Sequence, residues 1–222
     1  MDEQVFADRR DAGDALAIRL AHLSDEPVLV LGLPRGGVVV AARVAERLDA
    51  PLDVVIVRKI GCPGHRELAM GALAEWGAHS AVVRNEHVIA QARVSDADFT
   101  AAHDREAAEA RRRVAGWGGA VPDLTATTVV LVDDGLATGA TMHAAIEVVR
   151  RAGAHRIVVA VPVGAADELR ELELNVDFKV DEVICCSTPR PFHAVGLHYR
   201  DFGEVDNRTV TRILAEAHER VG

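Results

Sequence analysis

Two adjacent carboxylates, Asp133 and Asp134, end an apolar run in the segment VVLVDDGLATGATM. The residues that follow, 135–141, are mostly small or carry a hydroxyl group. Glycines let a backbone approach a ligand closely, and amides at the start of a helix point outward as donors to anions. The carboxylates themselves would repel a phosphate, so they need hydroxyl donors or a cation. The segment therefore predicts a site for a phosphorylated sugar, with its hydroxyls at the acids and its phosphate at the small residues.

Apolar runs and helical patterns alternate on both sides of this segment. Continuously apolar strands are typical of a parallel sheet whose two faces are covered by helices. The ligand crevice of such a sheet lies beyond the carboxyl ends of its strands, where Asp133 and Asp134 would stand. We therefore expect an α/β fold with a central parallel sheet of about five strands flanked by helices. The strands are expected at residues 27–34, 52–59, 127–134, 155–163 and 180–186, and the helices between them at 38–49, 143–153 and 165–172.

The same segment resembles the phosphoribosyl pyrophosphate (PRPP) fingerprint of the type I phosphoribosyltransferases, in which four apolar residues precede two acids and a Thr/Gly stretch. The resemblance implies a type I fold and transfer of a 5-phosphoribosyl group from PRPP to a nitrogenous base, with Mg2+ as cofactor and release of pyrophosphate. It assigns Asp133 and Asp134 to the ribose hydroxyls and, through PRPP and water, to the metal. The phosphate would be bound by Gly135, Leu136, Ala137, Thr138, Gly139, Ala140 and Thr141. A strand followed by a polar turn and a helix cap is the plainer interpretation.

Two further stretches could bind the leaving pyrophosphate. LGLPRGGVVVA follows the first core strand and resembles the pyrophosphate loop of the family, in which Arg35 would supply cationic donors. Gly36 and Gly37 would let the backbone approach oxygens and open the next helix. Arg58 and Lys59 end the next expected strand at the same edge of the sheet, where two cations would complement pyrophosphate. A simple strand-to-helix turn and a pair of solvated strand-end charges are the alternatives.

Residues 60–95 are rich in glycine, and they contain two short runs, LAMGAL and SAVVR, that could pair as a hairpin. This excursion resembles the mobile loop that type I enzymes close over the substrate, which would exclude water. A surface hairpin without a catalytic group is the alternative. The hinge candidates are Gly61, Pro63 and Gly64, and the polar candidates are His65, Arg66 and Glu67, of which Glu67 is assigned to catalysis.

We interpret the chain, 1–222, as a single domain whose core spans about 28–186. Residues 187–204 and an N-terminal helix would form a hood over the acceptor. Aromatic side chains in this hood could stack on a planar base, although an apolar plug that closes the sheet is an equal alternative. The hood aromatics are Phe192, Tyr199 and Phe202, and further helices are expected at residues 6–23, 95–115 and 205–220.

The segment departs from the family pattern at Ala137. Enzymes that act on 6-oxopurines commonly carry an acidic residue there, so a hypoxanthine or guanine transferase is disfavoured and the acceptor stays open. The missing acid also keeps an alternative function open, a regulator that senses PRPP or a nucleotide without transfer. A third interpretation, a phospho-acceptor receiver domain, fits poorly, because receivers usually place paired acids after their first strand.

The composition argues against several other classes of protein. A formal charge of −9 disfavours nucleic-acid binding, which depends on cations that neutralise phosphates. No apolar run approaches the roughly 18 residues of a membrane span, and the charged start MDEQVFADRR lacks the features of a secretion signal, so we expect a cytoplasmic protein. Cys62, Cys185 and Cys186 form no CxxC pair, and a structural zinc site is not expected. Related enzymes are often dimers, and the sequence is compatible with a homodimer.

Overall fold

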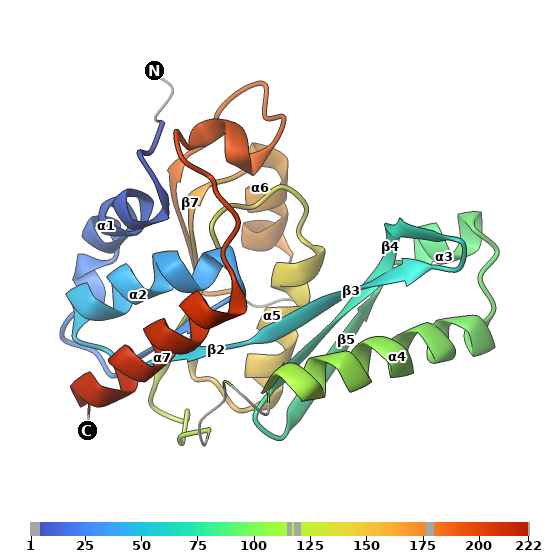
Figure 1. The fold of residues 1–222 in the computed structure, drawn as a ribbon, viewed down its shortest axis with the longest axis horizontal. Coiled ribbons are helices and arrows are strands. Elements are labelled where there is room, and N and C mark those ends of the chain that lie inside the picture. Colours follow the sequence, from blue (N-terminus) through green and yellow to red (C-terminus); the bar gives the residue numbers. More distant parts are fainter. Residues whose placement is uncertain (1–4, 115–116, 118–120, 176–179, 222) are drawn as a thin grey trace.

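Two β-sheets organise the protein, and Figure 1 shows the smaller one extending from the larger as an arm. The computed structural model describes residues 5–114, 117, 121–175 and 180–221. The larger, central sheet is parallel, with the strand order β2 (Leu52–Val54), β1 (Val28–Gly32), β6 (Thr128–Val132), β7 (Arg156–Val163) and β8 (Glu182–Ser187). The smaller sheet is antiparallel, with the order β3 (Ile56–Cys62), β4 (His65–Trp76) and β5 (His79–Arg84). The five-stranded parallel sheet and its helices confirm the predicted fold class.

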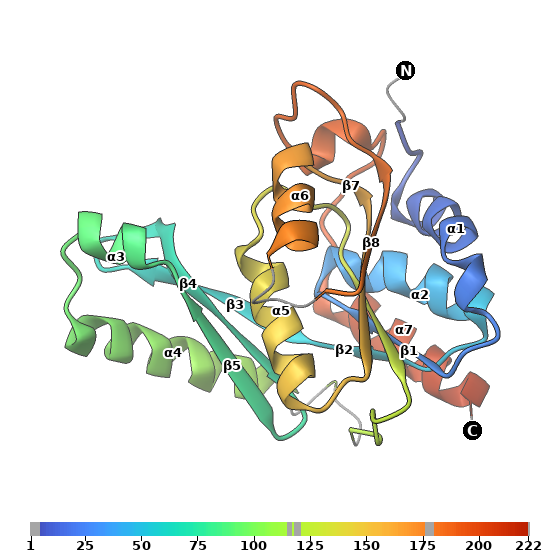
Figure 2. The same cartoon turned by 180° about the vertical axis from the view of Figure 1, so that it is seen from behind.

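Helices cover the central sheet on both faces, as Figures 1 and 2 show. Val28 and Val30 of β1 pack in one layer with α1 (Arg9–Arg19), α2 (Gly36–Leu48) and α7 (Asn207–Val221). Leu29 and Leu31 pack in the other layer with α5 (Ala140–Arg151) and α6 (Ala166–Leu174). Every residue of β1 and β6 is buried, which explains why both read as unbroken apolar runs. Within the described residues, no helix is both long and apolar enough to cross a membrane.

The first helix is shorter than the expected 6–23. It begins at Arg9, because the Asp8 side chain caps it by accepting hydrogen bonds from the backbone N–H groups of Arg10 (2.7 Å) and Asp11 (2.9 Å). Phe6 is not helical; it forms a β-bridge with Tyr199 and is buried. The helix ends at Arg19, and a short 3-10 turn (Ala21–Leu23) follows. Phe6 therefore joins the start of the chain to the segment between β8 and α7, residues 188–206, which we call the C-terminal segment.

The single strand expected at 52–59 is in fact two strands in different sheets. β2 pairs with β1 in the central sheet, and the last link is the hydrogen bond from Val55 N–H to the carbonyl of Gly32 (3.2 Å). The chain then enters the arm as β3, which pairs with β4. Arg58 and Lys59 consequently lie within an arm strand rather than at the edge of the central sheet. No local pattern marks this break, because both strands contribute buried apolar residues and the run stays apolar throughout.

The predicted pairing of LAMGAL with SAVVR is confirmed by the antiparallel ladder of β4 and β5. Helix α4 (Asp96–Val114) covers one face of the arm sheet, where Phe99 and Ala102 pack with Ile60 and Met70. Helix α5 packs against β4 and β5 on the other face, so it serves both sheets. The expected cap of α4 is present, since the Ser95 hydroxyl accepts a hydrogen bond from the N–H of Asp98 (3.2 Å). A short helix, α3 (Glu86–Gln91), links the hairpin to α4.

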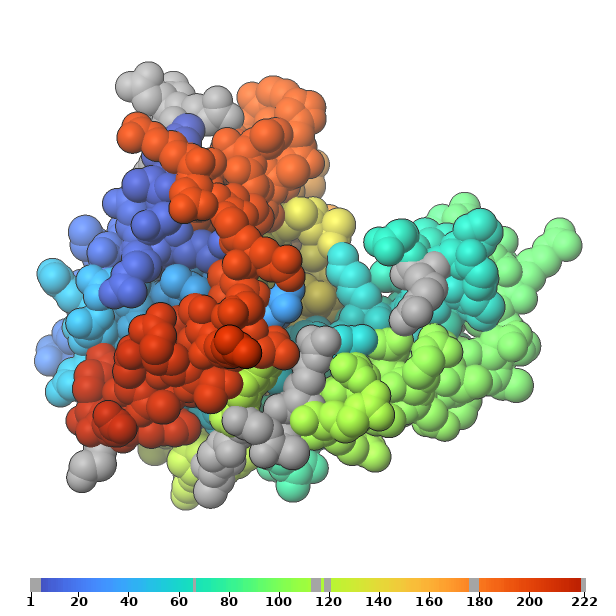
Figure 3. All heavy atoms as spheres, in the orientation of Figure 1, coloured from blue at the N-terminus to red at the C-terminus, as the bar shows by residue number. Residues whose placement is uncertain are grey.

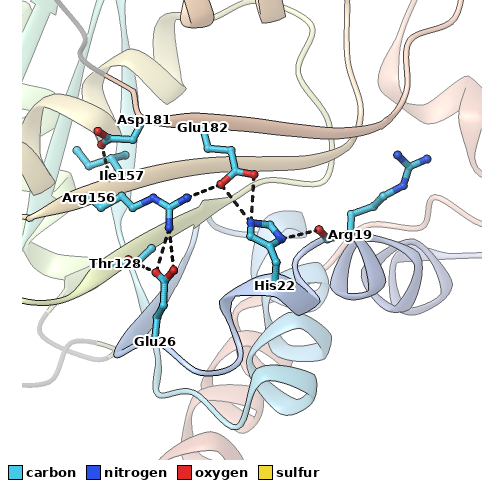
Figure 4. Close-up of polar contacts among 8 residues, drawn as sticks. All are labelled: Arg19, His22, Glu26, Thr128, Arg156, Ile157, Asp181 and Glu182. Atoms are coloured by element: carbon cyan, nitrogen blue, oxygen red, sulfur yellow. Dashed lines mark hydrogen bonds and ion pairs between the residues drawn. The ribbon is translucent and has the colours of Figure 1, made fainter.

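Charged side chains fasten together the starts of three central strands (Figure 4). Arg156, which begins β7, donates to Glu182 of β8 (2.7 Å) and to Glu26 (3.0 Å). Glu26 also accepts a hydrogen bond from the hydroxyl of Thr128 in β6 (3.0 Å), and His22 contacts Glu182 (3.1 Å). These groups satisfy one another at the amino-terminal edge, opposite the edge where the acidic pair lies. Their arrangement indicates a structural network.

Candidate functional site

The acidic pair lies at the carboxyl end of β6, as expected for a ligand site in a parallel sheet. The loop that follows is fixed to the end of the neighbouring strand β7. Leu136 donates its N–H to the carbonyl of Val163 (2.9 Å), and its own carbonyl accepts from the N–H of Ala165 (2.8 Å). These two hydrogen bonds hold Asp133 and Asp134 between β6 and the start of α5.

The PRGG loop, residues 34–37 at the end of β1, lies directly against the acidic pair, Asp133 and Asp134. A Cβ atom on Gly36 would collide with Oδ2 of Asp134, and one on Gly37 would stand 2.7 Å from the carbonyl oxygen of Val132. Only glycine leaves room for this approach. The structure therefore brings together the two segments that the sequence singled out, although about a hundred residues separate them.

The two carboxylates have different surroundings. Asp133 accepts a hydrogen bond from the N–H of Asp134 at Oδ1 (2.8 Å), and burial together with the charge of Asp134 raises the pKa of Asp133 well above its usual value. Asp134 forms an ion pair through Oδ2 with Nε of Arg9 in α1 (2.7 Å), and these side chains are only 17% and 12% exposed. Within the described residues, the second oxygen of each carboxylate accepts no hydrogen bond. A carboxylate oxygen without such a partner can accept a hydrogen bond from a ligand that reaches it.

Arg9 was not among the predicted site residues; it lies 125 positions from its partner, in the N-terminal helix that was expected to form part of the hood. Its Nη1 donates to the carbonyl of Gly203 (2.8 Å), and its guanidinium lies 3.8 Å from the centre of the Phe202 ring. Tyr199 donates its hydroxyl to the carbonyl of Asp134 (2.5 Å). Tyr199 and Phe202, noted in the sequence for base stacking, therefore contact the acidic pair and its arginine.

The small residues after the acidic pair form a loop that leads into α5. Ala137 and Thr138 are exposed, while Gly135 packs so closely on Val195 that a Cβ atom would stand 2.5 Å from Cγ1 of that side chain. The N–H of Gly139 donates to a carboxylate oxygen of Glu168 in α6 (2.7 Å). The backbone N–H of Gly139, which was predicted to bind phosphate, is therefore already bonded to a carboxylate. Glu168 was not among the predicted site residues.

Arg35 forms an ion pair with Glu204, a carboxylate that was not among the predicted site residues. Its Nη2 donates to Oε1 of Glu204 (2.5 Å), and the two side chains are 37% and 80% exposed. An ion pair exposed to this degree is weak, so a charged ligand can displace Glu204.

The remaining predicted residues lie together on the arm. A cleft of about 460 Å³ is lined by Val57, Arg58, Lys59, Gly61, Glu67, Arg105 and Glu106. Arg58 donates two hydrogen bonds to one oxygen of buried Glu106, at 3.0 Å and 2.6 Å. In the described part of the chain, no hydrogen bond or ion pair joins Lys59 or Glu67 to the acidic pair. The Arg66 side chain lies outside the described residues.

The structure therefore divides the predicted residues into a core group and an arm group. The core group comprises Arg35, Gly36, Gly37, Asp133, Asp134 and residues 135–141, and the arm group comprises Arg58, Lys59 and Glu67. Figure 3 shows a notch in the outline of the molecule between the C-terminal segment and the arm. Helix α5 begins at the core group and packs on the arm sheet, so it connects the two groups.

Two carboxylates alone do not make a resident metal site. Across the described ranges, no group of three or more His, Cys, Asp or Glu side chains could hold a metal ion. The free oxygens of Asp133 and Asp134 are suitable donors for a hard cation such as Mg2+, provided that other oxygens come from a ligand or from water.

A model of the phosphoribosyl transferase domain matches residues 4–200 of the chain. The chain belongs to the phosphoribosyl transferase family. This membership confirms the resemblance carried by VVLVDDGLATGATM and assigns the domain to the transferase enzymes.

Two curated proteins of Mycobacterium tuberculosis, from strains CDC 1551 and H37Rv, are each named "Putative phosphoribosyl transferase" and are 44% identical over 217 residues. The match covers 97% of this chain and 47% of each relative, so the chain spans about half the length of the curated relatives it matches. The crystal structure of TT1426 from Thermus thermophilus has a TM-score of 0.73 and 43% identity, over 96% of this chain and 99% of that one. A hypothetical protein from Neisseria gonorrhoeae with bound ppGpp has a TM-score of 0.50 and 13% identity, over 97% and 98% of the two chains, and shares the fold alone.

Proposed function

We propose that this domain transfers a 5-phosphoribosyl group from PRPP to a nitrogenous base and releases pyrophosphate. The observation that supports this most is the contact between the PRGG loop and the acidic pair. In this contact, donors for an anion and acceptors for hydroxyls lie side by side at one sheet edge. A sugar with a pyrophosphate at C1 and a phosphate at C5 presents those groups in that order.

In the proposed reaction, a nitrogen of the base forms a bond to C1 of the ribose as the bond from C1 to the pyrophosphate oxygen breaks. The bonding electrons leave with pyrophosphate, and the base nitrogen loses its proton to water or to a basic group. Positive charge develops on the ribose ring and negative charge on the leaving group, so the protein must stabilise both. Asp133 and Asp134 would hold the ribose hydroxyls beside the cationic ring, and Arg35 with the amides of Gly36 and Gly37 would bind pyrophosphate.

The loop from Gly135 to Thr141 would bind the 5-phosphate through the hydroxyls of Thr138 and Thr141 and through its amides. The amide of Leu136 is already bonded to the Val163 carbonyl, and that of Gly139 would have to exchange Glu168 for the phosphate. The N-terminal end of α5 adds a partial positive charge there. Mg2+, when bound, would neutralise part of the pyrophosphate charge, with Asp133 and Asp134 contacting it through water.

The arm would supply the residues that complete the site. Lys59 would neutralise the leaving group, and Glu67 would act nearby, if the arm closes over the bound substrate and excludes water. Arg58, also assigned to PRPP, is paired with Glu106 in this structure, so it would reach the ligand only by leaving that partner. Mobility of the arm stays a prediction.

Ala137 does not indicate which base is the acceptor, because its exposed side chain carries no group that could serve as an acid or base. The test is therefore a panel of purine and pyrimidine bases, each incubated with PRPP and Mg2+ while pyrophosphate release is measured. We expect turnover with at least one base, reduced at least about tenfold in Asp133→Asn and in Asp134→Asn. Asp123→Asn, which changes an exposed carboxylate remote from the sheet edge, is the matched control. Equal turnover in all four proteins would refute the assignment of the acidic pair.

A second function, sensing of PRPP or a nucleotide without transfer, is supported by the contact of Glu168 with Gly139. A phosphate that binds this loop must displace the carboxylate, so ligand binding would be coupled to a movement of Glu168, as a ligand sensor requires. Calorimetry separates the two functions. Binding of PRPP, or of a nucleotide carrying a pyrophosphate group such as ppGpp, without pyrophosphate release for any base would favour the sensor.

A further inference from the structure

We propose that Arg9 is a positioning residue for the acidic pair, and that it presents the free oxygen of Asp134 to a ribose hydroxyl. This inference rests on the proposed binding of a phosphorylated sugar. Arg9 belongs to α1, which lies outside the PRPP segment, the PRGG loop and the arm.

The geometry of the pair is specific. Nε of Arg9 binds Oδ2 of Asp134 at 2.7 Å, which leaves Oδ1 as the oxygen that can accept from a ligand. Both side chains are largely buried, unlike those of the many exposed ion pairs on this protein. A charge-assisted hydrogen bond in such surroundings fixes the rotation of the carboxylate much more firmly than a surface pair does.

Arg9 is itself immobilised from two sides by the C-terminal segment. The carbonyl of Gly203 accepts its Nη1 at 2.8 Å, and the ring of Phe202 lies under the guanidinium at 3.8 Å. Gly36 closes a third side, because a Cβ atom there would stand 2.8 Å from Nε of Arg9. Arg9 is thus held in place between the C-terminal segment and the carboxylate of Asp134.

The backbone of Asp134 is held as well. Tyr199, which packs against Phe202 with ring centres 4.9 Å apart, donates its hydroxyl to the Asp134 carbonyl at 2.5 Å. Main chain and side chain of one acid are therefore both anchored by the segment around residues 199–203. Such anchoring fixes the direction of that carboxylate, as is required of a group that receives a hydroxyl of defined position.

The experiment couples the arginine to individual hydroxyl groups of the ligand. Dissociation constants are measured by calorimetry for ribose 5-phosphate and for its 2-deoxy and 3-deoxy analogues, with the wild type, Arg9→Gln, Arg9→Lys and Arg10→Gln. Arg10 is the matched control, because it is the next residue of α1, is exposed, and makes no side-chain ion pair within the described residues.

We expect the wild type to bind one deoxy analogue about tenfold more weakly than ribose 5-phosphate. Arg9→Gln should reduce that ratio to below about threefold, Arg9→Lys should restore part of it, and Arg10→Gln should leave it unchanged. Inorganic phosphate should bind the four proteins alike. A structural role alone would weaken all ligands together and would not change the ratio.

Several outcomes would overturn the proposal. The first is an unchanged ratio of the dissociation constants of the deoxy analogue and ribose 5-phosphate in Arg9→Gln. The second is tighter binding of ribose 5-phosphate by that variant, because Arg9 would then compete with the ligand for Asp134. The third is the absence of any hydroxyl preference in the wild type. If Arg9→Gln does not fold by circular dichroism, Phe202→Leu keeps the arginine and removes its support, and the ratio should fall in the same direction. Failure of the proposed transfer is separately visible, since it is loss of pyrophosphate release with the hydroxyl preference intact.

Discussion

Trp76 donates its indole N–H to Oδ2 of Asp53 at 3.0 Å, and this hydrogen bond joins the arm to the central sheet. Asp53 lies in β2, and its other oxygen accepts from the N–H of Val54 (2.8 Å). Trp76 ends β4, and both residues are buried. The direction in which the arm leaves the core is therefore set by a buried polar contact as well as by apolar packing.

Replacing Trp76 with Phe should destabilise the protein by about 1 to 3 kcal/mol, because a buried carboxylate oxygen loses its donor. Trp117→Phe is the control. Its indole N–H donates to the hydroxyl of Thr211 (2.9 Å), an exposed group that water can satisfy, so the loss should be about 1 kcal/mol or less. Urea unfolding measures both, and equal losses would show that the Asp53 contact has no special weight.

Arg58 and Lys59 are adjacent in sequence, but replacing Arg58 should mainly lower stability, whereas replacing Lys59 should mainly lower activity. Arg58→Met leaves buried Glu106 without its main partner and should lower the free energy of unfolding by about 1 to 3 kcal/mol. Lys59→Met should change stability by no more than about 0.5 kcal/mol while lowering PRPP-dependent turnover. Chemical denaturation and pyrophosphate release give the two readouts. A stable but inactive Arg58→Met protein would instead give Arg58 a direct role toward the ligand.

Removing the charge of Glu168 should strengthen binding of phosphorylated ligands. The carboxylate lies on the N–H of Gly139 and repels an incoming phosphate, whereas glutamine keeps the size and an acceptor oxygen without the charge. We expect Glu168→Gln to bind ribose 5-phosphate about three to ten times more tightly by calorimetry. Glu173→Gln, an exposed change on the same helix, should have no such effect. Weaker binding by Glu168→Gln would mean that the carboxylate supports the site.

Glu75 should make stability depend on pH. Burial raises the pKa of this carboxyl, and the nearby charge of Arg111 offsets the effect only in part. A carboxyl with a raised pKa contributes stability below the unfolded pKa of about 4.3, and that contribution is lost as pH rises through the folded value. Glu75→Gln should therefore raise the free energy of unfolding at pH 7, with the gain disappearing below about pH 4. Urea unfolding across this range tests it, and exposed Glu86→Gln should give no comparable gain.

Local pattern was sufficient for most of the core. The buried strands β1, β6 and β7 and the helices between them follow from apolar runs and helical spacing, because a covered parallel sheet imposes those patterns on the chain. The acidic and PRGG segments could be singled out as candidate sites because they follow parallel strands, where ligands bind, and because they resemble family segments. The two segments then met at one sheet edge, since parallel strands β1 and β6 are neighbours and end together.

What sequence alone determined was therefore the type of sheet and the edge at which the acidic pair and the PRGG loop lie, both of which depend on short-range pattern; the roles of the residues at that edge stay predictions. Tertiary structure alone decided the break between β2 and β3, the pairing of Arg58 with Glu106, and the contacts of Arg9 with Asp134 and of Glu168 with Gly139. Such contacts join residues far apart in the chain whose types are common on any protein surface. Only the packing that buries them and brings them within hydrogen-bonding distance makes them specific.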